Sequence, residues 1–236
     1  MTEAFGLSDT GCVRANNEDY YRIEPALGLY LLADGMGGAK AGERASELAV
    51  DTIAGVFTET GQRDAQALLK ALETANYKVL ELARTDAKLE GMGTTLVAAL
   101  DLGEELLIAS VGDSRAYVLD ADSFRAVTED QSWINEVGRP LGLDEASLRA
   151  HPLRNVLTMA IGAGANLVVN SYKIPWKPGS LALLSSDGLH GVIAREELER
   201  ILRAEEPLEN KCRRFIAAAR AAGAPDNVTA VLLRRT

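Results

Sequence analysis

The 236-residue sequence has little cysteine, little histidine and no long hydrophobic run, and each shortage excludes a class of protein. Its two cysteines, Cys12 and Cys212, are too few for a disulfide scaffold or for a zinc site built from cysteine. The uncharged run 155–172 contains glycines and asparagines and falls short of the ~20 apolar residues that a membrane-spanning helix needs. The first residues show no basic stretch followed by an apolar one, so we expect no signal peptide and a cytoplasmic protein.

The sequence also has fewer basic residues than acidic ones. The chain has 25 Lys and Arg against 34 Asp and Glu, which gives a formal net charge of −9. A net anion does not attract nucleic acid or an anionic membrane, so we exclude both as main partners. With 47% hydrophobic and 25% charged residues, the composition is that of a globular protein. No linker, repeat or low-complexity tract divides the sequence, which predicts a single domain over residues 1–236.

Hydrophobic patterning predicts both strands and helices. The apolar run 29–33 is typical of a buried strand that ends at a glycine-rich stretch, and apolar residues then recur at helical spacing over 45–56 and 68–82. Further strands are expected at 94–100, 106–111, 115–119, 124–127, 167–174, 181–185 and 228–233, and a helix is expected at 208–222. This order of elements favours an α+β fold in which helices cover antiparallel sheets.

The segment 133–154 departs from this regular pattern. It contains Gly138, Pro140, Gly142 and Pro152, and it shows neither a helical nor a strand period. We expect it to form an exposed flap, and this name is used for residues 133–154 below.

Four aspartates take similar positions relative to the predicted strands. Asp34, Asp113 and Asp187 each follow a buried apolar run, and Asp226 precedes the final strand. If these strand ends meet, the carboxylates repel one another unless a cation lies between them. Hard oxygen ligands in a chain with only two histidines favour Mg²⁺ or Mn²⁺ over zinc. Asp-Gly pairs such as Asp34-Gly35 are often ordinary turns, but four such acids together favour the metal interpretation.

Longer motifs containing these acids occur in a fixed order from about residue 6 to residue 233. They are Ser8-Asp-Thr-Gly-Cys-Val-Arg14-Ala-Asn-Asn-Glu18-Asp19, Ala33-Asp34-Gly35-Met36-Gly37-Gly38, Gly91-Met-Gly-Thr-Thr95, Val111-Gly112-Asp113-Ser114-Arg115-Ala-Tyr117, Ser185-Ser-Asp187-Gly188-Leu189 and Pro225-Asp226-Asn227-Val228-Thr229. Together they make the sequence resemble the metal-dependent protein serine/threonine phosphatases of the PP2C (PPM) family, in their compact bacterial form. Each motif alone is weak evidence, whereas the ordered set is specific.

The resemblance implies a fold and a reaction. The fold is a four-layer αββα sandwich of two antiparallel β-sheets flanked by helix pairs, with the flap as a small subdomain. The reaction is hydrolysis of phosphoserine and phosphothreonine in proteins, in which a water or hydroxide that bridges two metal ions attacks phosphorus without a covalent phosphoenzyme. The implied partners are phosphorylated proteins and a cognate Ser/Thr kinase, and we expect a monomer.

The resemblance also implies two or three Mn²⁺ or Mg²⁺ ions. Asp34 would bridge two of them, with the carbonyl of Gly35 on one ion and with Asp187 and Asp226 on the other. Asp113 and Asp187 would contribute to a third ion. These assignments rest on the match of motifs and not on spacing.

Other residues of the motifs would act around the ions. Glu18 and Asp19 match acids that hold metal-bound water. Arg14 matches a phosphate-binding arginine, a role that suits the planar fork of its guanidinium. Without the surrounding motif, Arg14 would be expected to pair with Glu18 or Asp19 at the surface.

The proton donor for the leaving group is left open. Met36 stands where many eukaryotic family members have a histidine. His190 follows Asp187 by three residues, so it could donate the proton or could be a structural histidine. Gln131 takes the place of a histidine in a Thr-x-Asp-His-Ser element of the family, and we assign it no catalytic role.

Two alternative functions remain at this point. The chain could be a catalytically reduced regulator that binds phosphoproteins with the same fold, although such a protein would usually have lost one of the acids. It could also be a small-molecule phosphatase that uses the same two-metal chemistry.

Overall fold

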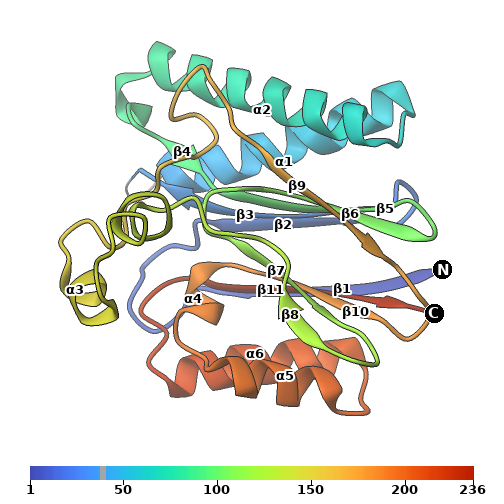
Figure 1. Ribbon diagram of the computed structural model, residues 1–236. Coiled ribbons are helices and arrows are strands. Elements are labelled where there is room, and N and C mark those ends of the chain that lie inside the picture. The colour runs from blue at the N-terminus through green and yellow to red at the C-terminus, as the bar shows by residue number, and fades with distance from the viewer. Residues whose placement is uncertain (38–40) are drawn as a thin grey trace.

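The computed structural model describes residues 1–37 and 41–236, so Gly38 at the end of the second motif lies outside the described residues. The described strands form two antiparallel sheets (Figure 1). The first sheet has the order β1 (Thr2–Asp9), β11 (Val228–Arg235), β10 (Leu181–Ser185), β7 (Arg115–Leu119) and β8 (Phe124–Ala126). The second has the order β2 (Asp19–Glu24), β3 (Leu29–Met36), β5 (Leu96–Asp101), β6 (Glu105–Val111) and β9 (Asn170–Pro175), with β4 (Gly93–Thr94) beside β3.

Long helices cover the outer faces of both sheets. Figure 1 shows α1 (Ala41–Thr60) and α2 (Ala65–Thr85) on one side, and α5 (Arg195–Arg203) and α6 (Leu208–Ala221) on the other. The short α4 (Asp187–His190) follows directly after β10. The expected α+β class with antiparallel sheets is confirmed. In the described part of the chain, no helix is both long and apolar enough to cross a membrane.

Both faces of the central strands are buried, which explains their unbroken apolar runs. Along β3, Leu29, Leu31 and Ala33 pack against the helices α1 and α2, while the intervening Tyr30 and Leu32 pack between the two sheets. This alternation follows from the two-residue period of a strand. Each fully buried leucine contributes about 1.5–3 kcal/mol to folding. The strand β3 is therefore held by an apolar layer on each of its faces.

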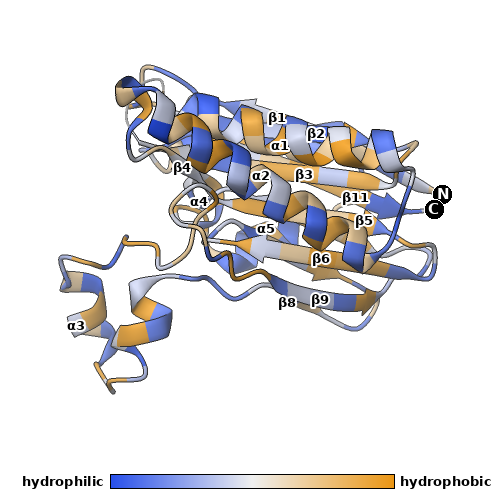
Figure 2. Ribbon diagram, turned by 90° about the horizontal axis from the view of Figure 1, so that it is seen from above, coloured by the Kyte–Doolittle hydropathy of each residue, from blue (hydrophilic) through white to orange (hydrophobic). Residues whose placement is uncertain are grey.

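The flap contains more regular structure than its sequence predicts. A π-helical turn (Ile134–Gly138) and α3 (Glu145–Ala150) lie within it, and the ring of Trp133 stacks on that of His151 with centroids 3.8 Å apart. A Cβ at Gly138 would lie 2.5 Å from Leu148 Cδ2, so glycine permits the close contact that joins the two helical pieces. Figure 2 shows the flap standing apart from the sandwich.

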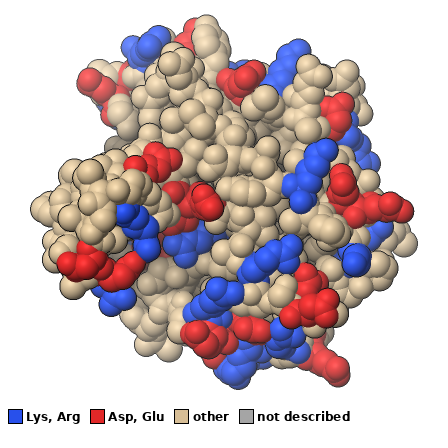
Figure 3. All heavy atoms as spheres, viewed as in Figure 1, with Lys and Arg blue, Asp and Glu red and all other residues tan. Residues whose placement is uncertain are grey.

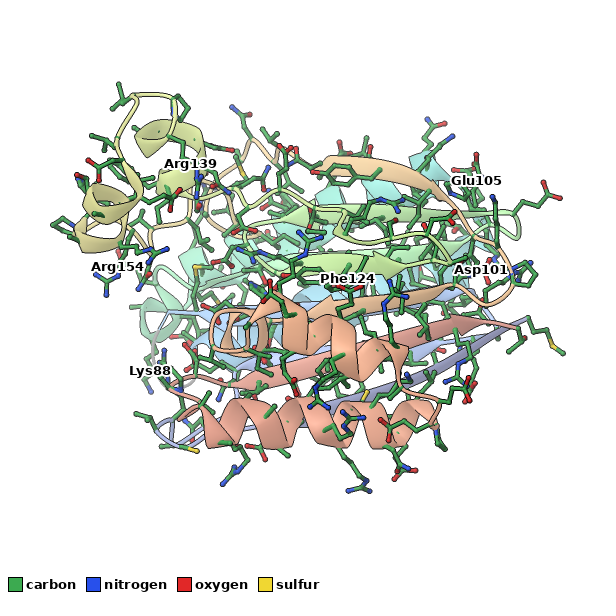
Figure 4. All side chains as sticks on the ribbon, turned by 60° about the horizontal axis from the view of Figure 1, so that its bottom comes forward. Lys88, Asp101, Glu105, Phe124, Arg139 and Arg154 are labelled. Atoms are coloured by element: carbon green, nitrogen blue, oxygen red, sulfur yellow. The ribbon has the colours of Figure 1, made fainter. Side chains whose placement is uncertain are left out.

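The sandwich has two distinct ends. One is the flap end, and the other is the terminal end, where the two chain termini lie (Figure 1). Figure 4 shows Arg139 and Arg154 of the flap at the first end, and Asp101 and Glu105 of the β5–β6 turn at the second. All the acids singled out from the sequence belong to the flap end.

Candidate active site

One cavity at the flap end gathers most of the predicted site residues. Its volume is about 1050 Å³. The predicted residues on its wall are Arg14, Glu18, Asp34, Gly35, Asp113, Asp187 and Asp226. Asp19 is absent from the wall and lies buried behind it, with 7% of its surface exposed. The flap and the segment after it supply the opposite wall, where Ile134, Arg139 and Arg154 lie.

Asp34 is positioned by backbone pairing on both sides. The strand β3 continues to Met36, so Asp34 lies within the strand and not after its end as the apolar run predicts. The Asp34 amide donates to Thr95 Oγ1 at 3.0 Å, and the Thr95 amide donates to the Asp34 carbonyl at 2.9 Å. Thr94 pairs with Gly35 in the short strand β4. These bonds use the backbone of Asp34 and leave its carboxylate to the cavity.

Asp187 and Asp226 approach each other because glycine follows Asp187. A Cβ at Gly188 would lie only 2.0 Å from the carbonyl oxygen of Asn227. No side chain fits in that space, so only glycine lets the start of α4 lie against the 226–227 loop. The Asp-Gly pair is therefore a packing requirement as well as a turn signal.

Burial and mutual repulsion raise the pKa values of several acids of this site. Burial, together with the charges of Asp19, Asp187 and Asp113, raises the pKa of Asp34 well above its usual value. Burial and the charge of Asp187 raise the pKa of Asp113 to about 7. Burial raises the pKa of Asp187, and the charge of Asp226 adds to the effect. Clustered carboxylates that disfavour their own ionised forms are typical of functional sites.

Asp19 lies behind the cavity wall, next to this cluster of acids. Burial raises its pKa to about 7, against hydrogen bonds that its Oδ2 accepts from Thr229 Oγ1 at 2.6 Å and Ser186 Oγ at 2.8 Å. Its other oxygen, Oδ1, is buried without a hydrogen-bond partner, and so is Oδ1 of Asp187. Unpaired buried oxygens are costly, which points to a missing positive partner.

The donor chemistry fits a hard divalent cation. Every candidate ligand is an oxygen, and two of the carboxylate oxygens have no other partner. Across residues 1–37 and 41–236, however, no three His, Cys, Asp or Glu side chains already converge as a closed ligand group. The site thus has the negative charge and the oxygen donors that cations need, but the described side chains are not arranged as a complete coordination shell.

Arg14 makes an ion pair that the sequence does not predict. Its Nη2 donates to Asp226 Oδ2 at 2.6 Å, so its partner is neither Glu18 nor Asp19. The Arg14 side chain is 53% exposed, and this bond raises its pKa. A half-exposed guanidinium at the cavity mouth keeps donors available for an incoming anion.

Asn227 holds the loop that carries Arg14, a role that sequence reasoning missed. Its Nδ2 donates to the carbonyl oxygens of Thr10 at 3.0 Å and Asn16 at 2.9 Å, and its Oδ1 accepts from the Glu18 amide at 2.8 Å. One buried amide therefore fixes three points of the loop. No local sequence signal could have found this role, because the three partners lie 209 to 217 residues from Asn227 in the chain.

A second arginine on the cavity wall is paired with an aspartate. Arg115 forms a fork with Asp130, from Nε to Oδ1 at 2.8 Å and from Nη2 to Oδ2 at 2.6 Å. Such a two-bond pair fixes the orientation of both side chains. Sequence reasoning quoted both residues and assigned a role to neither.

His190 lines the cavity but is poorly suited to donate a proton. It is partly buried, and this burial together with the charge of Arg115 lowers its pKa well below the usual value. Its Nδ1 shares a hydrogen bond with Ser185 Oγ at 2.9 Å. A histidine that stays neutral in this way favours the structural interpretation.

Comparison with known proteins decides the family. The sequence profile described as "Protein phosphatase 2C" matches residues 13–233. The chain belongs to the protein phosphatase 2C family. This membership makes it a protein serine/threonine phosphatase, whose substrates are phosphorylated proteins.

Similar members of the protein phosphatase 2C family occur in bacteria. "Serine/threonine phosphatase stp" of Listeria innocua is 34% identical, and the match covers 97% of this chain and 94% of that protein. The structure resembles that of Stp1 from Staphylococcus aureus, with a TM-score of 0.91, 31% identity and coverage of 100% and 96% of the two chains. It also resembles the catalytic domain of PstP in complex with two manganese ions, with a TM-score of 0.87, 31% identity and coverage of 99% and 97%.

Proposed function

We propose that this phosphatase removes phosphate from serine and threonine residues of proteins by direct attack of water, with divalent cations held at the flap end. The proposal rests above all on one observation. Partly buried carboxylates with raised pKa values line one cavity whose mouth carries Arg14, buried Asp19 lies behind it, and two oxygens of these acids are unpaired. The manganese ions named for the similar PstP domain support the choice of metal.

The ligand assignments are those that the resemblance to the protein phosphatase 2C family implies. Asp34 would be shared by two Mn²⁺ or Mg²⁺ ions, with the Gly35 carbonyl on one and Asp187 and Asp226 on the other. Asp113, whose pKa is raised by burial and by the charge of Asp187, would serve a third ion together with Asp187. Two bound ions would supply positive charge and lower the pKa of a shared water, so that hydroxide forms near neutral pH.

The remaining groups would hold water on the ions or bind the phosphate of the substrate. Glu18 lies on the wall and Asp19 behind it, and both would hold water on the ions. Gly42 makes room for Glu18, because a Cβ there would lie 2.2 Å from Glu18 Oε2. Arg14 would exchange its bond to Asp226 for the phosphate oxygens, which match its planar fork. No nucleophilic side chain is needed, which agrees with an attack by water.

The architecture fits the same proposal. We assign residues 1–236 to one catalytic domain, a four-layer αββα sandwich with the flap as its subdomain. A serine/threonine kinase would supply its phosphorylated substrates, and we assign it neither a nucleic-acid partner nor a membrane partner. The chain would act as a monomer.

The proposal has a direct test. Purified protein should release phosphate from a phosphothreonine peptide in Mn²⁺, lose that activity in EDTA and regain it when Mn²⁺ is restored. A rate that EDTA leaves unchanged would contradict the metal assignment. A preference for nucleotides or sugar phosphates over phosphopeptides would instead favour a small-molecule phosphatase, and metal binding without turnover would indicate a regulator.

A further inference from the structure

Gln131, to which sequence reasoning assigned no role, lies where the flap joins the sandwich. It is buried, with 3% of its surface exposed. Its neighbours Asp130 and Ser132 line the cavity, whereas Gln131 does not. Because neighbouring residues of an extended segment face opposite sides, Gln131 points behind the cavity wall.

Gln131 binds the turn that carries Asp113. The Gly112 amide donates to Gln131 Oε1 at 2.9 Å, and the Gln131 amide donates to the Gly112 carbonyl at 2.9 Å. Gly112 has φ +89°, a conformation that favours glycine, so the turn is held in one shape from both sides. The next residue along the chain is Asp113.

Gln131 also binds the segment that returns from the flap. The Thr158 amide donates to the Gln131 carbonyl at 3.0 Å, and Gln131 Nε2 donates to the Val168 carbonyl at 3.0 Å. One residue further on, Ser132 pairs with Leu157 across the base of the flap. All four hydrogen-bonding groups of Gln131 are therefore used, on three different segments.

The polarity of its two side-chain partners explains why an amide stands here. One partner is a backbone N–H that needs an acceptor, and the other is a backbone C=O that needs a donor. The terminal amide of glutamine offers both at once. A side chain without them would leave two buried backbone groups unpaired.

We propose that Gln131 is a positioning residue that ties the Asp113 turn to the base of the flap, so that the carboxylate and the substrate-facing flap keep one arrangement. This inference rests on the proposed function, because it gives Asp113 a role with metal. Loss of the tie should loosen the flap and weaken metal binding together.

The test uses Gln131→Met and Gln131→Glu, with Gln66→Met on the exposed face of α2 as the matched control. Trypsin reports on the flap, because it can cut after Arg149 and Arg154, whereas Pro140 protects the bond after Arg139. Isothermal titration reports on Mn²⁺ affinity, and KM is measured for a phosphothreonine peptide and for p-nitrophenyl phosphate. All assays run well below the melting temperature Tm of each variant.

Both Gln131 variants should be cut in the flap about fivefold faster or more, and should need about fivefold more Mn²⁺ for half-saturation of the weakest site. KM for the peptide should rise more than KM for the small ester. Gln131→Glu adds negative charge, which would by itself strengthen Mn²⁺ binding, so weaker binding in this variant must come from lost position. It also serves as the test if Gln131→Met does not fold.

A folded variant with wild-type cleavage and wild-type Mn²⁺ affinity would overturn the inference, even if its Tm were lower. A variant in which only flap cleavage or only Mn²⁺ affinity changed would also overturn it, because Gln131 would then not link the flap to the Asp113 turn. The proposed function fails differently: wild-type protein would then show no Mn²⁺ requirement before any variant is compared.

Discussion

Aspartates have opposite environments at the flap end and at the terminal end of the sandwich. At the terminal end, Asp120 accepts from the Ser123 amide at 2.8 Å and pairs with Arg125 at 3.1 Å, and these bonds lower its pKa. Asp101 there accepts from Thr2 Oγ1 at 2.7 Å and from the Gly103 amide at 2.8 Å. At the flap end, Asp34 is partly buried beside other acids, and burial together with their charges raises its pKa.

The difference separates acids that stabilise a turn from acids that serve chemistry. A buried carboxylate beside other carboxylates costs stability, and a fold tolerates such a group where function requires it. Elsewhere charges are matched: α5 pairs Glu199 with Arg203, and Figure 3 shows acidic and basic side chains interspersed on one face. The following changes break or sharpen this contrast.

Asp34→Asn should have the largest effect. It should lower kcat by about 10³-fold or more, because the acid shared between ions is lost. Thermal unfolding in EDTA should show no loss of stability, because a repelled buried charge is removed. Asp120→Asn is the matched control at the terminal end, and it should leave kcat unchanged. Equal kcat in both variants would remove the distinction between the two ends.

Arg14→Ala should act mainly on substrate binding. Loss of a charge-assisted pair to phosphate should raise KM by about 10–100-fold. Arg14→Lys should restore only part of this, since lysine lacks the planar fork. Steady-state kinetics with a phosphothreonine peptide measures both. An unchanged KM would show that the bond to Asp226 is the whole role of this arginine.

Asp113→Asn should change how stability depends on pH. The folded protein raises the pKa of Asp113 from 3.8 to about 7, so between these values it binds more protons than the unfolded chain. The contribution of this acid is therefore fully present at low pH and is lost as pH rises through that window. In EDTA, the variant should match wild type near pH 4 and be more stable by about 2–4 kcal/mol at pH 7.5. Denaturant unfolding at both values measures this, and parallel curves would contradict it.

Lys211→Met should give the smallest change and should affect stability alone. Lys211 is buried behind the first sheet, and its Nζ donates to the carbonyl oxygens of Ile201, Leu202 and Ala204 at the end of α5. Unpairing these groups should lower Tm by about 4–10 °C and leave kcat unchanged. Lys70→Met on exposed α2 is the control. A changed kcat would mean that the two ends are coupled.

Much of the sheet core could be predicted from the sequence, because buried strands have unbroken apolar runs. The prediction of 181–185 coincides with β10, and that of 106–111 with β6 to within one residue. The strand predicted at 167–174 begins only at Asn170, because the Val168 carbonyl bonds a side chain instead of a neighbouring strand. Hydrophobic patterning predicts neither β1, which is a half-buried edge strand, nor α5, a nine-residue helix rich in charge.

The motifs predicted the candidate site residues, most of which share one cavity, but they did not predict the contacts of these residues. Nothing local to Arg14 indicates Asp226 as its partner, since 212 residues separate them in the chain. The support given by Asn227 and Gln131 likewise depends on segments that meet only after folding. Residue type and order predict the chemistry, whereas long-range packing decides which group faces which.

The position of β11 has a consequence for synthesis of the protein. This strand is the last of the described strands in the chain yet lies between β1 and β10 in its sheet, and Asp226 lies two residues before its first residue. While a nascent chain still lacks these residues, β1 has no neighbour on that side and the cavity lacks one of its acids. The first sheet therefore cannot form in full before synthesis has passed residue 235.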